Sequence, residues 1–423
     1  MKEDLLHYLW QFKLFYTSNL KTTNGDNLDV VLVGNPNSNS GPDFFNAQLR
    51  IDKQLWAGNV EIHVKSSDWY VHNHESDSNY DNVILHVVWE HDVAVFTKDN
   101  SEIPTLELQQ LVSKNLLARY HKLFSKRQKW INCEHDIFDV NKFVFHNWKE
   151  RLYFERLEQK ALLIEELLIA SNNNWEAVLF MLLAKNFGLK TNATTFFEMS
   201  QEIDFSIVRK EAKQVFNLES LFFGQLGMLN ETSENVYFNQ LKKEYNYQLK
   251  KYKLLKSDRK KVEYFRLRPP NFPTIRISQL ASLYSSQQNL FTELMQLKTV
   301  DAFYNFLSVS VSEFWKAHYT FEKESPKRNK KLTKSFIDLL LINTIIPLKF
   351  VYLKQHDKFD QTVLMKLIEQ LKPEKNSVID NFLKLKIEAK NAFDTQALLQ
   401  LKRNYCEQQK CLQCAIGNYL LKS

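Results

Sequence analysis

Glycine is scarce in this sequence, with only 8 residues among 423, and four of them fall within the first 58 positions. Tight turns between strands often need glycine, because it adopts positive φ at little steric cost. The uneven distribution therefore predicts that strands and turns gather near the N-terminus and that most of the remaining chain is helical.

Long hydrophobic runs are absent as well. No apolar stretch approaches the roughly 20 residues that a membrane-spanning helix requires. The N-terminal stretch MKEDLLHYLWQFKLFY has amphipathic spacing and carries acidic residues from position 3, unlike a signal peptide. We therefore expect no membrane partner and a cytoplasmic location, where the four cysteines would not form structural disulfides.

Three common motifs are also missing: the Walker A loop, the G-x-G-x-x-G turn and the G-x-S-x-G elbow. Their absence argues against P-loop NTPases, Rossmann dehydrogenases and α/β-hydrolases. The sequence carries no signal for an oligomeric state.

Basic residues are in modest excess, with a formal net charge of +7 and a pI of about 8.9. They gather in the runs Lys250–Lys261 and Lys323–Lys334, and Arg266, Arg268 and Arg276 surround a rigid proline-rich turn. Guanidinium groups suit phosphates, so these arginines predict a contact with nucleic acid. The alternative is a solvated surface for the runs and a structural elbow for the arginines.

The spacing of apolar residues divides the chain into two textures. Residues 5–18 have helical spacing, and short β-type segments follow. The predicted strands are Leu28–Val33, Phe44–Ile51, Leu55–Lys65, Asn82–Asp92, Val93–Phe96 and Pro104–Leu108, with a short helix at Ser67–His74. The clearest later helices are Trp148–Ser171, Trp175–Phe187 and Ser335–Ile346, the last of which Pro347 should end or kink.

The predicted fold class is therefore α+β. A small mixed α/β module spans residues 1–110, and a helical region spans residues 111–323. Residues 324–423 form a C-terminal helical region that contains a cluster of cysteines.

The strand Leu55–Lys65 ends in the sequence VEIHVK. Because side chains alternate along a strand, Glu61, His63 and Lys65 share one face, opposite Val60 and its apolar neighbours. Burying unpaired ionisable groups is costly. The pattern therefore predicts that these groups are either solvated or gathered around an ion.

This arrangement resembles the core of the PD-(D/E)XK nucleases. Pro42 and Asp43 match the PD element, and Glu61-Ile62-His63 matches the (D/E)-X-K element with histidine in the usual lysine position. The resemblance implies that Asp43 and Glu61 bind Mg²⁺, while His63 or Lys65 supports the attacking nucleophile. The order of one helix, three strands, one helix and one strand agrees with that fold. If neither His63 nor Lys65 supplies a positive charge, the resemblance implies a catalytically inactive fold.

Histidines are unusually dense in the same stretch. Five of the eleven lie there, with several acids between them: His63, His72, His74, His86, His91, Asp68, Glu75, Asp77 and Asp81. A second hypothesis is therefore a zinc-dependent hydrolase that uses this cluster. The alternative is a set of core histidines beside a polar loop.

The cysteines have a suggestive spacing. Cys406, Cys411 and Cys414 form a C-x4-C-x2-C set, and Cys133 is the only other cysteine. Four thiolates could hold an iron–sulfur cluster or a zinc ion. The alternative is four unrelated cysteines buried in helical cores.

Several longer stretches resemble a bacterial family of unknown function, domain of unknown function 2851. They are GPDFFNAQLRI, WAGNVEIHVKSSDW, YDNVILHVVWEHD, RLRPPNFPTIRISQLA, INTIIPL and the closing C-x4-C-L-x-C-x-I-G, which together run from residue 41 to 417. The family implies no activity. We therefore expect a metal-dependent nuclease-like protein, or alternatively a non-catalytic nucleic-acid-binding or scaffold protein with a structural metal or iron–sulfur site at the cysteines.

Overall fold

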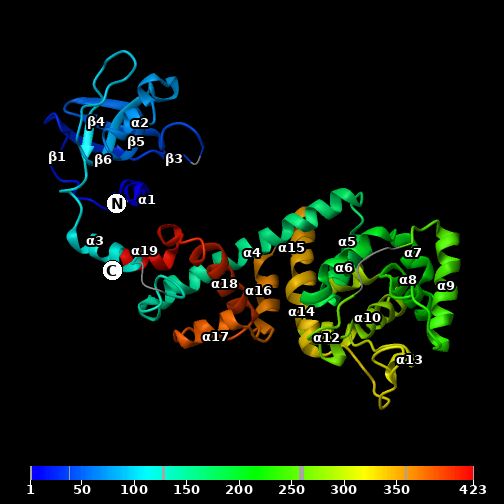
Figure 1. Cartoon of the computed structure of the whole chain (residues 1–423). Coiled ribbons are helices and arrows are strands. Elements are labelled where there is room, and N and C mark those ends of the chain that lie inside the picture. Colours follow the sequence, from blue (N-terminus) through cyan, green and yellow to red (C-terminus); the bar gives the residue numbers. More distant parts are fainter. Residues whose placement is uncertain (1, 38, 126–128, 257–261, 358–359, 423) are drawn as a thin grey trace. The chain divides into compact units, whose positions relative to one another are not determined.

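The computed structural model describes residues 2–37, 39–125, 129–256, 262–357 and 360–422. These residues form two compact units. Unit 1 contains Met1–Trp148 together with Leu401–Ser423, and unit 2 contains Lys149–Gln400 (Figure 1). The observed division differs from the predicted boundaries at residues 110 and 323, because the last part of the chain packs with the first.

Unit 1 contains a mixed sheet, as predicted for the N-terminal module. The described strands are β1 (Leu20–Lys21), β2 (Asn27–Leu32), β3 (Asn35–Pro36), β4 (Phe44–Ile51), β5 (Gln54–Lys65), β6 (Val83–Glu90) and β7 (Thr105–Glu107). Their order is β1-β2-β4-β5-β6-β7, and β3 pairs with the start of β4. The pairs from β1 to β5 are antiparallel, whereas β5–β6 and β6–β7 are parallel.

Short helical elements connect and cover the sheet. α1 (Glu3–Gln11) packs against β5 and buries Leu5, Leu9 and Trp10. Between β5 and β6 the chain forms α2 (Asp68–Val71), η1 (His74–Ser76) and η2 (Ser78–Tyr80). The predicted strand Val93–Phe96 is wrong, because only one of its residues forms an isolated bridge, with Glu102.

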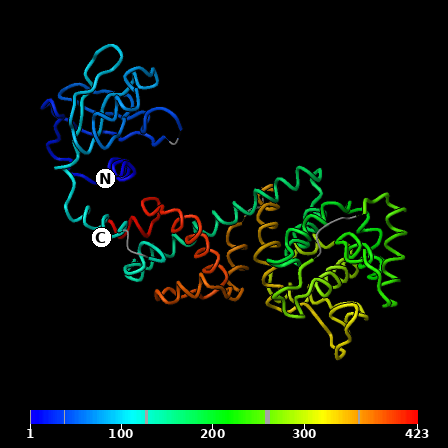
Figure 2. The backbone as a smooth tube through the Cα atoms, viewed as in Figure 1, coloured from blue at the N-terminus to red at the C-terminus, as the bar shows by residue number. Residues whose placement is uncertain are grey.

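The rest of unit 1 brings the C-terminal segment back to the residues that follow the sheet. It contains α3 (Lys114–Leu123), η3 (Ile137–Asp139), the beginning of α4 (Lys142–Ala170), η6 (Leu401–Cys406), η7 (Cys411–Gln413) and α19 (Ala415–Lys422). α19 packs against α3, and η7 contacts α1. Both ends of the described chain therefore belong to the same unit (Figure 2).

Unit 2 is helical apart from isolated bridges among its described residues. After the remainder of α4 its helices are α5 (Trp175–Phe187), α6 (Leu189–Glu202), α7 (Phe205–Glu211), α8 (Val215–Gln225), α9 (Val236–Tyr252), η4 (Pro269–Asn271), α10 (Pro273–Ser286), α11 (Leu290–Gln296), α12 (Val300–Phe306), α13 (Glu313–Lys316), α14 (Lys334–Leu340), η5 (Leu341–Ile345), α15 (Ile346–Gln355), α16 (Gln361–Gln370), α17 (Ser377–Lys384) and α18 (Ala392–Gln400). The mixed sheet followed by a largely helical region confirms the predicted fold class.

A π-helical turn, η5, precedes Pro347, so the helix there is irregular, as the proline predicted. The continuous stretch Lys334–Gln355 is long and apolar enough to cross a membrane by composition alone. However, 78% of its most apolar window is buried inside the fold, as in the core helix of a soluble protein.

Candidate functional site

Asp43 and Glu61 lie side by side because β4 and β5 are antiparallel neighbours. The backbone N–H of Asp43 donates to Glu61 Oε2 at 3.1 Å, and the N–H of Ile62 donates to Asp43 Oδ2 at 3.0 Å. Each carboxylate therefore accepts a hydrogen bond from the backbone at or next to the other residue. Glu61 is only 4% exposed.

Histidines surround the Glu61 carboxylate. His63 lies two residues farther along β5, and its Nε2 is 3.5 Å from Glu61 Oε1. His74 Nε2, from η1, is 3.3 Å from the same oxygen. His72 Nδ1 lies 3.0 Å from His63 Nε2. Between His72 and His74, Asn73 adopts a left-handed conformation with φ of 60°, which asparagine tolerates better than most residues.

These separations match those of ligands on one small ion. Ligands about 2.0–2.1 Å from a tetrahedral zinc ion are about 3.3 Å from one another. The ligand atoms of His63, His72 and His74 all lie within 4.8 Å of one another, and Glu61 Oε1 is near two of them. The ring nitrogen Nδ1 of His74 is buried without a hydrogen bond, an unfavourable state that a bound cation would relieve.

A second layer of residues supports the histidines. His86, which pairs with Glu61 across β5 and β6, is fully buried, and its Nε2 is 2.8 Å from His63 Nδ1. Such a contact fixes the orientation of a ligand ring. His74 stacks on Tyr80 with ring centroids 3.8 Å apart, and Trp69 packs edge-on against His74.

Burial controls the charges in this cluster. Burial raises the pKa of Glu61 to about 7; the Asp43 charge acts in the same direction, while His74 opposes it. Burial lowers the pKa of His63 to about 3 and that of His86 well below its usual value. Both imidazoles are therefore neutral at pH 7, the form that binds a metal.

Asp43 also belongs to a second group, with Glu3 and His7 from α1. His7 Nε2 is 3.2 Å from Asp43 Oδ2 and 3.7 Å from Glu3 Oε1. Burial alone would lower the pKa of His7, but the two carboxylates outweigh it and raise the pKa to about 10. His7 is therefore a cation at neutral pH.

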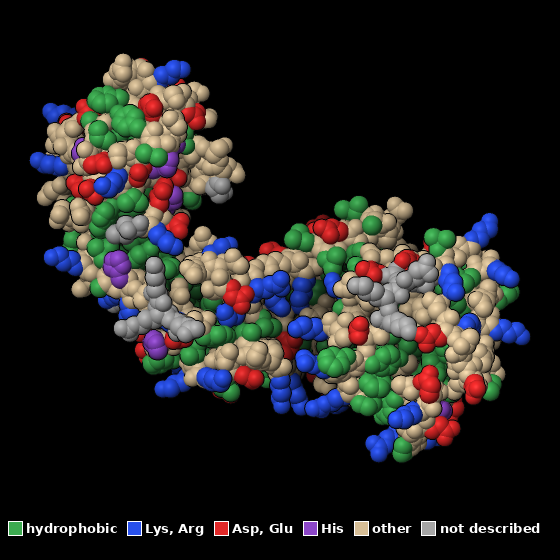
Figure 3. All heavy atoms as spheres, in the orientation of Figure 1, with side chains coloured by type: hydrophobic (Ala, Val, Ile, Leu, Met, Phe, Trp, Pro, Cys, Tyr) green, Lys and Arg blue, Asp and Glu red, His purple; other side chains and the backbone are tan. Residues whose placement is uncertain are grey.

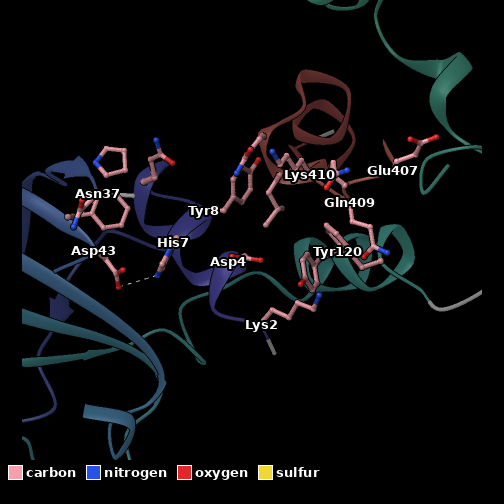
Figure 4. A pocket seen from close by; sticks show the side chains of 17 residues that line it. Lys2, Asp4, His7, Tyr8, Asn37, Asp43, Tyr120, Glu407, Gln409 and Lys410 are labelled. Atoms are coloured by element: carbon pink, nitrogen blue, oxygen red, sulfur yellow. Dashed lines mark ion pairs between the residues drawn. The ribbon is translucent and has the colours of Figure 1, made fainter. Parts of the chain in front are cut away.

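A cavity of about 610 Å³ adjoins this second group. Its lining combines α1 and the start of β4 with α3 and the segment Glu407–Gln413. His7 and Asp43 meet on one side, and Lys410 lies on another (Figure 4). On the visible face of unit 1, histidine side chains reach the surface beside acidic ones (Figure 3). The cavity is large enough for a small organic molecule or a short segment of a polymer.

Lys65, expected to support the nucleophile, has different neighbours among the described residues. Its side chain is 49% exposed, and its Nζ lies 3.8 Å from Glu90 Oε1. Its described contacts do not include Glu61 or His63, although all three share one strand face.

The four cysteines all line one narrow cavity in unit 1. However, no three of their sulfurs lie within 4.8 Å of one another, whereas thiolates on one zinc ion would be about 3.8 Å apart. The thiols are therefore not clustered into one single-ion site.

The predicted nucleic-acid contacts separate into two kinds. Arg276 is buried, donates to Asn271 and Gln279 side chains, and lies over the Phe336 ring. The structure therefore corrects its assignment as a phosphate contact. Arg266 and Arg268 are exposed.

Of the two basic runs, residues 257–261 lie outside the described part of the chain. In the other run, Lys330 donates to the carbonyls of Trp315 and His318, and Lys327 pairs with Glu313. These two lysines are therefore already engaged within the fold.

Sequence reasoning missed Glu3 and His7. Their only signal was the amphipathic spacing of the N-terminal segment, which predicts a helix but not the strand on which that helix packs.

The chain belongs to the family described as "Protein of unknown function (DUF2851)", whose model matches residues 3–377. This finding confirms the family resemblance. No curated protein and no solved structure matches the chain. The comparisons therefore give no support to a PD-(D/E)XK core.

Proposed function

We propose that this protein is a divalent-metal-dependent hydrolase of phosphodiesters, with nucleic acid as its substrate class. One observation carries the proposal: the side chains of Glu61, His63, His72 and His74 converge at ligand-like distances, with His72 at the exposed edge of an otherwise largely buried group. Perturbed titratable groups that meet in a cluster are typical of functional sites. Asp43, which donates its backbone N–H to Glu61, connects this group to the cavity that it lines.

The donor set favours a first-row transition metal. Carboxylates alone, as expected for Asp43 and Glu61, would suit Mg²⁺. Three imidazoles instead favour Zn²⁺ or Fe²⁺. In this proposal His63, His72 and His74 hold the ion together with Glu61, and His86 positions His63.

A bound divalent ion would polarise a phosphoryl oxygen and lower the pKa of a water molecule. The chain supplies the remaining functions. His63 is neutral and cannot provide the positive charge of the lysine usual at its position. The His7 imidazolium, held by Asp43 and lining the cavity, supplies a positive charge there instead.

The lining of the cavity carries charges of both signs, with Lys2, His7 and Lys410 beside Asp4, Asp43 and Glu407. The two lysines and His7 are the groups that would contact a phosphate.

The test is a cleavage assay on protein stripped of metal by a chelator. Zn²⁺, Mn²⁺ and Mg²⁺ are added back separately, with DNA, RNA and bis(p-nitrophenyl) phosphate as substrates. We expect metal-dependent cleavage that falls at least about 100-fold in His63→Ala and Glu61→Gln. His135→Ala serves as the matched control, because this side chain is 70% exposed and lies outside the site.

Tight metal binding without cleavage of any substrate would refute the hydrolase and favour a non-catalytic, nucleic-acid-binding role. Failure of every metal to bind would refute the metal site itself.

A further inference from the structure

The four cysteines come together from distant parts of the sequence. Cys133 precedes η3, and Cys406, Cys411 and Cys414 occur at the end of η6 and around η7. All four line one cavity of about 20 Å³, and none forms a disulfide.

The spacing of the sulfurs favours an iron–sulfur cluster over a single zinc ion. A zinc ion would gather its thiolates to about 3.8 Å, and no three of the sulfurs lie within 4.8 Å of one another. In a four-iron cluster each thiolate binds a different iron atom, and in a two-iron cluster at most two share one, so the sulfurs are spread more widely than on a single zinc ion. The C-x4-C-x2-C spacing with a remote fourth cysteine is also a known cluster spacing.

Polar hydrogens lie near two of the sulfurs. The Asn132 side-chain amide donates to Cys411 Sγ at 3.4 Å. The backbone N–H groups of Ile416 and Gly417, together with the Trp148 indole, interact with Cys414 and favour its thiolate. Such N–H contacts to sulfur tune and stabilise cluster ligands.

Gly417 also has a structural reason to be glycine. A Cβ at this position would lie 2.1 Å from the carbonyl oxygen of Cys411. The start of α19 must therefore pass directly over the turn that carries the cysteine.

As free thiols the four groups are chemically inert. Burial raises the pKa of Cys133 and Cys406, and the neighbouring cysteines raise it further. Burial raises the pKa of Cys414 to about 11. Binding of iron would therefore release the thiol protons as each sulfur forms its bond to iron.

We propose that Cys133, Cys406, Cys411 and Cys414 ligate an iron–sulfur cluster that fixes the C-terminal segment to the part of unit 1 that follows the sheet. Iron and inorganic sulfide are the components it would require. The segment between Cys406 and Cys411 lines the same 610 Å³ cavity as Asp43 and His7. The cluster therefore also holds one wall of the substrate cavity, and only this second role rests on the proposed hydrolase function.

The test begins with the full-length protein, purified without oxygen and reconstituted with ferric iron, sulfide and a thiol reductant that supplies any electrons the cluster requires. We expect equal amounts of iron and acid-labile sulfide, two or four of each per chain, with a visible charge-transfer band. Cys133→Ser and Cys406→Ser should lose most of the iron and sulfide. His63→Ala is the matched control and should retain both, because it disturbs only the other proposed metal site.

A second measurement does not depend on the folding of variants. Hydrogen exchange of the wild-type protein should show faster exchange in residues 407–413 after the cluster is removed by a chelator. Zinc bound in place of iron, absence of iron and sulfide after reconstitution, or iron retained in both cysteine variants would overturn the proposal. A protein that carries the cluster but cleaves no phosphodiester would refute only the proposed hydrolase function.

Discussion

The replacement Glu61→Gln separates the cost of burying a charge from the benefit of binding a metal. Glutamine has nearly the same shape and can still accept the N–H of Asp43. In the wild-type protein burial raises the pKa of Glu61 from 4.5 to about 7. Its ionised form is therefore disfavoured in the metal-free fold.

The direction of the pH dependence follows from linkage. Because the folded pKa is above the unfolded value, the stability linked to Glu61 is fully present below about pH 4.5 and is lost as the pH rises through about 7. A difference of this size between the folded and unfolded pKa corresponds to about 3 kcal/mol. Above pH 8, metal-free Glu61→Gln should therefore be more stable than the wild type by up to about 3 kcal/mol.

A bound cation should remove this advantage. Metal at 100 times its Kd stabilises the wild type by about 2.7 kcal/mol, and it should stabilise the variant much less. Hydrogen exchange of β5 and β6, measured with a chelator or with excess Zn²⁺ and compared at equal pH, reports the local free energy of opening. A stability difference that stays the same from pH 5 to pH 8, or a variant that gains as much from metal as the wild type, would refute this reasoning.

Three further predictions follow from the same contacts. His63→Ala should abolish the metal-dependent rise in melting temperature, whereas His135→Ala should keep it; equal responses would contradict the ligand assignment. Gly417→Ala should destabilise unit 1 by about 1–3 kcal/mol in denaturant unfolding, because the new methyl group overpacks a backbone contact. The variant should also bind less iron per chain. Unchanged iron content and unchanged stability would refute this close contact. Arg276→Ala should lower the stability of unit 2 by about 3 kcal/mol in thermal unfolding, since it removes buried hydrogen bonds and a cation–π contact. The exposed control Arg268→Ala should change the stability by less than about 0.5 kcal/mol. Equal effects of the two variants would contradict the structural role of Arg276.

Regular alternation and periodicity made most of the secondary structure predictable. The predicted strand Phe44–Ile51 coincides with β4, and the predicted helix Trp175–Phe187 coincides with α5. The alternation in VEIHVK also identified Glu61 and His63 as neighbours on one face of β5. These features depend on local spacing, which the sequence records directly.

Features that depend on long-range packing were not predictable in the same way. The approach of His7 to Asp43 requires α1 to pack on the sheet, and nothing in the local pattern specifies that placement. The left-handed Asn73, which brings His72 and His74 to the same ion-sized space, is one of many asparagines in the chain. The burial of Arg276 likewise depends on the Phe336 ring, which is 60 positions away in the sequence.

The central claim is that the acidic and histidine cluster of unit 1 binds a divalent metal. The most direct measurement is anomalous X-ray scattering at the absorption edge of zinc or manganese, from crystals of metal-loaded protein. We expect one strong peak about 2 Å from the ring nitrogens of His63, His72 and His74 and bordered by the Glu61 carboxylate. The claim would be contradicted if the protein cleaves phosphodiesters, or binds metal elsewhere, while the acidic and histidine residues show no anomalous peak.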